Sequence, residues 1–227
     1  MRTIDFCRTV SENDLIPTRR VKNLSRGQNK ERESIFKKEG INFHIRHVGA
    51  ISRLFLNHNI STFSEATHFV RELAYGRNRN KEDLKTVFQD SCGTCSSKHA
   101  LLKRLAEENH VADLKLMMGI FRMNAVNTPK ISATLQRHKL DYIPEAHNYQ
   151  KYADLILDFT TVNSKPADCE NDLLEEIEIT ADKISDFKVK YHQDYLRTWL
   201  HKQNFPKLTL DELWKIREQC IADLATR

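Results

Sequence analysis

Apolar residues recur at helical spacing through residues 44–57, where they stand three and four positions apart and predict one buried helical stripe. A second helix is expected to begin after Thr62, because the sequence T-F-S-E at that point matches a capping box, and to continue to Gly76. Asn80 can cap a third helix over residues 81–90. This part of the chain is therefore predicted to be helical.

The pattern changes in the middle of the chain. Strong helix formers fill residues 96–110, so Cys95 is expected at or near the first turn of a helix. Residues 113–123 are mostly apolar and rich in β-formers, which favours a buried strand, although a run of that length is also compatible with a helix. Two further short strands are expected over residues 146–152 and 155–161.

The C-terminal third returns to helical periodicity. Residues 165–178 are acidic with a proline at their start, which is typical of a linker into a helix. A final helix is expected to begin at Thr209, where T-L-D-E is another capping box, and to bury Trp214. The helix before it is expected to bury a periodic set of residues: Ile184, Phe187, Val189, Tyr191, Tyr195, Leu196, Trp199 and Leu200. Helices, a small antiparallel sheet and further helices together predict an α+β protein.

Composition narrows the class of protein. The 227 residues are 40% hydrophobic and 30% charged, which is enough apolar chain for a packed core. No apolar run approaches the roughly 20 residues of a membrane helix, and the N-terminal residues lack the apolar centre of a signal peptide, so we expect a cytoplasmic protein without a membrane segment.

Positive charge is concentrated in residues 17–39, which carry eight Lys or Arg against three Glu. That stretch has one aromatic residue, Phe36, so it lacks the stacking platforms of a single-strand binder. We therefore interpret it as a solvated basic arm and do not expect nucleic acid as a partner.

The five cysteines are an odd number, and in a reducing compartment they are expected to be free thiols. Burial as small hydrophobic residues would account for Cys7, Cys169 and Cys220. Cys95 differs because it is predicted to open a helix, where unpaired N–H groups and the helix dipole stabilise a thiolate. A nucleophilic thiolate also requires a histidine for proton transfer and a third group that orients the histidine.

The candidates for those two roles are His147 and Asp158. If Ala153 and Asp154 form a two-residue hairpin turn, opposed residues sum to 307, and His147 and Asp158 become diagonal neighbours on one face. Their backbones would be about 7 Å apart, so the side chains could meet. A register slip by one residue would place them on opposite faces.

These residues resemble the transglutaminase-like superfamily, whose papain-like core packs a cysteine-bearing helix on an antiparallel sheet. The resemblance rests on a helix-opening G-T-C, a histidine 52 residues later, and an aspartate 11 residues after that within L-D-F-T, and it spans roughly residues 60–161. It implies that Cys95 is the nucleophile, His147 the general base and then acid, and Asp158 the orienting carboxylate. The chain departs from the family where Asn148 and Tyr149 replace the second and third positions of H-A-W, and where Phe159 follows the aspartate in place of proline.

The sequence Q-D-S-C-G-T-C also resembles the papain signature, in which the glutamine donates to the oxyanion hole. That resemblance makes Gln89 a candidate oxyanion donor, although Ser96 stands where papain has tryptophan and no histidine lies at the papain distance. Tyr149 and Cys92 are candidates for the substrate groove, with packing the favoured role for Tyr149.

Alternative interpretations of Cys95 remain open at this point. It could be a buried packing residue, one half of a thioredoxin-type redox pair with Cys92, or a zinc ligand together with Cys92 and His99. The redox pair would require a preceding buried strand, and the zinc site lacks a visible fourth ligand. The histidines other than His147 are expected on helix surfaces or in loops: His44, His47, His58, His68, His99, His110, His138, His192 and His201.

We therefore expect three parts: a basic arm and helical extension over 1–59, a transglutaminase-like core over 60–165, and a C-terminal helical extension over 166–227. The resemblance implies cysteine-dependent acyl transfer on a protein or peptide amide, by hydrolysis or transglutamination. That chemistry requires no metal and no organic cofactor. The alternative is a catalytically silent module of the same fold that binds a partner through its basic surface. The sequence does not indicate an oligomeric state.

Overall fold

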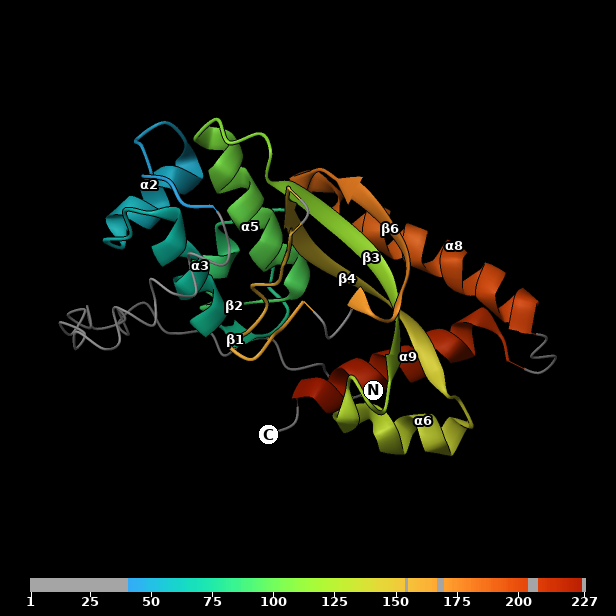
Figure 1. The fold of residues 1–227 in the computed structure, drawn as a ribbon. Coiled ribbons are helices and arrows are strands. Elements are labelled where there is room, and N and C mark those ends of the chain that lie inside the picture. The colour runs from blue at the N-terminus through green and yellow to red at the C-terminus, as the bar shows by residue number, and fades with distance from the viewer. Residues whose placement is uncertain (1–40, 154, 167–169, 204–207, 226–227) are drawn as a thin grey trace.

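A computed structural model describes residues 41–153, 155–166, 170–203 and 208–225, and within them the chain folds as a mixed α+β protein (Figure 1). The basic arm, Cys7 and Cys169 lie outside these residues. The helices and strands, with 3-10 turns written η, are α2 (Ala50–Asn57), α3 (Phe63–Glu72), β1 (Ala74–Tyr75), α4 (Thr86–Gln89), β2 (Cys92–Gly93), α5 (Cys95–Glu108), β3 (Lys115–Asn124), η1 (Pro129–Ile131), α6 (Ser132–His138), β4 (Tyr142–Tyr152), β5 (Leu155–Leu157), β6 (Leu173–Ile179), η2 (Ala181–Ile184), α8 (Asp186–Gln203) and α9 (Leu210–Ala225).

The capping-box prediction at Thr62 is confirmed. The Glu65 backbone N–H donates to Thr62 Oγ1 at 3.2 Å, and Glu65 Oε2 accepts from the Thr62 backbone N–H at 3.1 Å. The predicted helix over 44–57 begins only at Ala50, because His44 forms an isolated antiparallel bridge with Thr62.

The predicted helix over 81–90 is wrong for most of its length. Only Thr86–Gln89 is helical. Asn80 Oδ1 accepts from the Glu82 backbone N–H at 3.0 Å, two residues on, so its side chain closes a local turn ahead of the helix. Competition between such turns and a helix is usual for asparagine.

Four antiparallel strands form the main sheet in the order β5-β4-β3-β6. The hairpin register is as predicted: Gln150 pairs with Leu157 and Tyr152 with Leu155, so each pair sums to 307. Ala153 has a positive φ of 50°, as a tight turn requires. β5 is shorter than predicted and ends at Leu157, which leaves Asp158 just beyond the last paired residue.

The linker predicted over 165–178 is wrong for its second half. Leu173–Ile179 is strand β6, and it pairs antiparallel with β3. Its sequence L-L-E-E-I-E-I alternates at the end, which is a strand signal, whereas its acidic composition is typical of a linker.

α5 is the central helix of the fold, since eleven of its fourteen residues are buried. Figure 1 shows it between the sheet and the helices α2 and α3, while α6 and α9 lie at the other end of β3 and β4. Its residues Leu101, Leu102 and Leu105 join the core that also holds Leu157 and Phe159 from the end of β5. This packing holds the first turn of α5 beside the segment that carries Asp158.

The buried face of α8 differs from the predicted one. Phe187 and Val189 are 42% and 37% exposed, and the buried residues of the helix are Lys188, His192, Leu196, Trp199 and Leu200. The true stripe begins with two polar residues, which hydrophobic periodicity does not reveal. The start of α9 is as predicted, because Thr209 and Glu212 exchange capping hydrogen bonds.

Among the described residues, no helix combines the length and the apolar character needed to cross a bilayer.

Candidate active site

Cys95 is the first residue of α5, and its side chain is largely buried, with 6% of the residue exposed. Gly93 lets the preceding strand approach this turn, because a Cβ at that position would lie 2.9 Å from both Lys98 Cγ and Ser97 Oγ. In the first turn of a helix the backbone N–H groups lack intrahelical acceptors, so the position favours an anion at sulfur.

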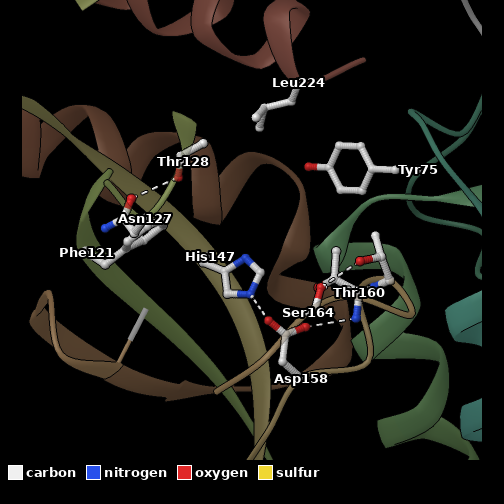
Figure 2. Close-up of a pocket in the computed structure, with 10 residues that line it drawn as sticks. Tyr75, Phe121, Asn127, Thr128, His147, Asp158, Thr160, Ser164 and Leu224 are labelled. Carbon is white, nitrogen blue, oxygen red and sulfur yellow. Dashed lines mark hydrogen bonds and ion pairs between the residues drawn. The ribbon is translucent and has the colours of Figure 1, made fainter. Parts of the chain in front are cut away.

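His147 and Asp158 meet as the hairpin register predicted. His147 Nε2 lies 2.9 Å from Asp158 Oδ2, and Asp158 Oδ1 accepts from the Thr160 backbone N–H at 2.8 Å (Figure 2). Both oxygens of the buried carboxylate are therefore engaged, and the imidazole ring is held in one orientation. Since Nε2 faces Asp158, Nδ1 is the ring nitrogen left for the Cys95 side chain.

The structure brings Cys95 to His147, and a hydrogen bond joins the two side chains. Burial by itself would raise the pKa of Cys95, but the positive charges of Lys188 and His147 outweigh it and lower that pKa to about 6. Burial would lower the pKa of His147, but Asp158 and Cys95 raise it well above its usual range. The pKa of Asp158 is lowered, since its contacts with His147 outweigh burial. These directions favour a thiolate beside an imidazolium at neutral pH.

His99 connects Cys95 to the segment that carries Asp158. Its Nδ1 lies 2.8 Å from the Cys95 carbonyl oxygen, and its Nε2 accepts from the Phe159 backbone N–H at 2.8 Å. The expectation that His99 lies on a helix surface is wrong, because it is fully buried. Burial lowers the pKa of His99 to about 4, so the ring is neutral and serves as a bridge between two backbone groups.

Lys98, in the same turn of α5 as His99, also binds the segment that follows β5. Its Nζ donates to the carbonyl oxygens of Leu73 and Thr160 at 2.6 and 2.8 Å. Burial lowers its pKa to about 8. α5 therefore positions the residues after β5 as well as Cys95.

Lys188 is a site residue that the sequence analysis missed. It comes from α8, it is buried, and its Nζ lies 3.8 Å from Cys95 Sγ. The same atom donates to Ser96 Oγ and to Asn148 Oδ1, each at 2.8 Å. The available signal in the sequence is that Lys188, His192 and Leu196 stand four residues apart, which places them on one face of a helix.

The other candidates occupy different places. Tyr149 is buried, its ring stacks beside His147 with centroids 6.2 Å apart, and its hydroxyl bonds to Glu176, so it supports the imidazole and is not a groove residue. Gln89 is exposed at the end of α4, and within the described part of the chain no hydrogen bond joins it to the triad.

Cys92 corrects two expectations. It is 1% exposed, so it cannot line an open groove. It is also disulfide-bonded, whereas Cys95 and Cys220 are free thiols, so the expectation of free thiols is wrong for Cys92 and a Cys92–Cys95 redox pair does not form here. Among the described residues no group of three or more His, Cys, Asp or Glu is arranged to hold a metal, and both ring nitrogens of His99 are engaged.

A pocket of about 290 Å³ opens beside the His147–Asp158 pair. Figure 2 shows Tyr75 and Leu224 across the pocket from Asp158, with the Tyr75 hydroxyl directed inward. Apart from the ionisable pair, the described residues that line it are uncharged: Tyr75, Phe121, Asn127, Thr128, Thr160, Thr161, Ser164 and Leu224. The pocket is therefore suited to a small group without charge.

Comparison with known proteins adds no further constraint: no family model matches the chain, and no match is found among curated proteins or solved structures.

Proposed function

We propose that this chain is a cysteine-dependent acyl-transfer enzyme with Cys95 as nucleophile, His147 as acid and base, and Asp158 as orienting carboxylate. The observation that carries the proposal is the convergence of these three side chains from α5, β4 and the end of β5, with the 2.9 Å contact between His147 and Asp158. A fully engaged carboxylate on one side of an imidazole and a thiol on the other is the arrangement that nucleophilic catalysis requires.

The reaction begins from the thiolate and the imidazolium. Cys95 Sγ attacks the carbonyl carbon of an amide, and the carbonyl electron pair moves onto oxygen. When the tetrahedral intermediate collapses, the carbon–nitrogen bond breaks and His147 gives its proton to the departing amine. This leaves a thioester on Cys95 and a neutral imidazole.

The second half of the reaction resolves the thioester. A water molecule or an amine attacks the thioester carbon while His147 accepts its proton, and the carbon–sulfur bond breaks to return the thiolate. Water would give hydrolysis, and an amine would give a new amide. The resemblance of the sequence motifs to those of transglutaminase-like proteins is compatible with both outcomes.

Backbone dipoles of α5 are the proposed stabiliser of the transient oxyanion. Cys95 lies where unpaired N–H groups of the first turn are available, and such fixed donors need not reorganise as charge develops. We do not assign this role to Gln89, because its side chain is exposed.

The pocket suggests which acyl group enters the site. The described residues of its lining supply hydroxyl, amide, aromatic and aliphatic groups, and among them only the proposed catalytic pair is charged. We therefore propose that the substrate presents an uncharged side chain, in a protein or peptide amide, to this pocket.

The test is a comparison of acylation and turnover in the same protein. p-Nitrophenyl acetate, an activated ester, should release a burst of nitrophenol and acetylate Cys95, which peptide mass spectrometry locates. Cys95→Ser should abolish the burst, whereas Cys220→Ser should preserve it, because burial raises the pKa of Cys220 to about 11 and keeps that thiol protonated. A burst that survives in Cys95→Ser, or acetylation that occurs mainly elsewhere, would overturn the proposal.

A further inference from the structure

Lys188 is a buried ammonium whose nearest anionic partner is the sulfur of Cys95. The residue is 8% exposed, and its Nζ lies 3.8 Å from Cys95 Sγ. No carboxylate within the described ranges lies in ion-pair distance of it. Burial of a charge is unfavourable unless an opposite charge or hydrogen bonds compensate it, so a thiolate at Cys95 offsets part of that penalty.

The surrounding hydrogen bonds hold the ammonium in place. Nζ donates to Ser96 Oγ and to Asn148 Oδ1, each at 2.8 Å, and Ser96 Oγ donates to the same Asn148 oxygen at 2.9 Å. The Asn148 amide is fixed in turn, because its Nδ2 donates to the Met117 carbonyl oxygen at 3.0 Å. An ammonium has three donors, so one remains after these two bonds and can be directed at sulfur.

The partners of Lys188 come from the positions where the chain departs from the families that it resembles. Ser96 stands where the papain signature has tryptophan, and Asn148 follows His147 where alanine is common. In this chain both side chains bind Lys188, and the Asn148 backbone N–H donates to Cys95. The two residues that differ from the family motifs, Ser96 and Asn148, therefore bind the same lysine of α8.

We propose that Lys188 is the counter-cation of the Cys95 thiolate beside His147, so that the thiolate persists when the imidazole gives up its proton to the substrate. Lys188 touches the reacting sulfur and therefore takes part in the catalysis proposed above. Its effect on the thiolate does not depend on any substrate.

The reaction changes the environment of Lys188 in a defined way. When Sγ bonds to the acyl carbon, the sulfur loses its negative charge and the protonated lysine is left without an anion. When the carbon–sulfur bond breaks, the electron pair returns to sulfur and the ion pair forms again. Lys188 thus stabilises the thiolate as the leaving group of the second step.

The decisive experiment measures the pH dependence of Cys95 alkylation by iodoacetamide in three variants. Lys188→Met should raise the apparent pKa of Cys95 by at least about one unit, which is about a tenfold loss of thiolate at pH values below both pKa values. His147→Ala should keep that pKa below the ordinary value of a free thiol, which is about 8.5. Lys190→Met is the matched control, since Lys190 is exposed on the same helix, and its profile should match the parent protein.

The result that would overturn the proposal is a folded Lys188→Met protein with the parental alkylation profile. A measurement on the unaltered chain covers the case in which that variant does not fold. Alkylation of Cys95 removes the anion, so the ¹⁵N signal of the Lys188 ammonium should shift. A signal that does not respond to alkylation would also overturn the proposal.

These outcomes are separable from those of the proposed function. If Cys95 depends on Lys188 for its low pKa but never accepts an acetyl group from p-nitrophenyl acetate, the ion pair stands and the acyl-transfer proposal fails. If acetylation occurs but the pKa of the Cys95 thiol depends only on His147, the acyl-transfer proposal stands and the ion-pair proposal fails.

Discussion

Replacement of His99 by glutamine tests the connection between Cys95 and the segment that carries Asp158. The imidazole bridges the Cys95 carbonyl oxygen and the Phe159 backbone N–H, each at 2.8 Å, in a fully buried position. Glutamine retains a polar side chain and stays uncharged at every pH, so the variant removes the titrating ring without placing a new charge in the core.

At neutral pH we expect the His99→Gln protein to be less stable by about 1–3 kcal/mol, the usual effect of leaving one buried donor without its partner. The donor at risk is the Phe159 N–H. The Cys95 carbonyl is less affected, because it also accepts the helical hydrogen bond from four residues along α5.

In acid we expect the effect of His99→Gln on the free energy of unfolding to change sign. The pKa of His99 is about 4 in the folded protein and about 6.5 in an unfolded chain, so between these values the unfolded chain binds a proton that the folded protein does not. The folded pKa is the lower one, so the stabilisation is complete above about pH 6.5 and is lost as the pH falls towards about 4. A difference of about 2.5 units corresponds to about 3 kcal/mol.

Urea unfolding at neutral pH and at about pH 4 measures both effects. The parent protein should lose about 3 kcal/mol more than His99→Gln between the two conditions. His138→Gln, an exposed position on α6, should follow the parent at both pH values. Parallel losses in the parent and in His99→Gln would refute the assignment of a neutral, buried bridge to His99.

Three further predictions follow from the same contacts. Asp158→Asn should leave the fold intact but reduce turnover of p-nitrophenyl acetate by roughly 10²–10⁴-fold, because the hydrogen bond that orients His147 for acid–base catalysis is changed. Unchanged turnover would exclude the orienting role. Gly119→Val should lower the free energy of unfolding, measured by urea titration, by about 1–3 kcal/mol, since even a Cβ at this position would lie 2.7 Å from Leu173 Cδ1 and 2.9 Å from Tyr149 Cε1. Equal stability would show that these two side chains can move aside. Lys98→Met should lower it by about 1–3 kcal/mol by leaving two carbonyl oxygens without their donor, and a neutral effect would show that water replaces the ammonium.

The meeting of His147 and Asp158 could be predicted because it depends on a local rule. A two-residue turn fixes the register, and strand alternation then decides which side chains share a face. The observed pairing of Gln150 with Leu157 confirms that register. The contact with Cys95 could only be expected from the resemblance, because it joins a helix and a sheet that are far apart in sequence.

The residues that the sequence did not reveal are polar groups buried by tertiary contacts. Lys188 and His192 occupy the inner face of α8, whereas hydrophobic periodicity predicts Phe187 and Val189 there, and both of these are exposed. The burial of His99 could not be predicted for the same reason, since it depends on hydrogen bonds to backbone groups of Cys95 and Phe159. Only coordinates show that such a side chain has partners.

The pocket and the reacting groups belong to different kinds of structure. Cys95 and His147 are held in a helix and a strand, whereas Asn127, Thr128 and Ser164 line the pocket from connecting segments. If the proposed acyl transfer holds, exchange of those loop side chains would alter which acyl group fits while the spacing of sulfur and imidazole stays constant. Selectivity in this scaffold is therefore open to redesign, by laboratory or by evolution, independently of its reactivity.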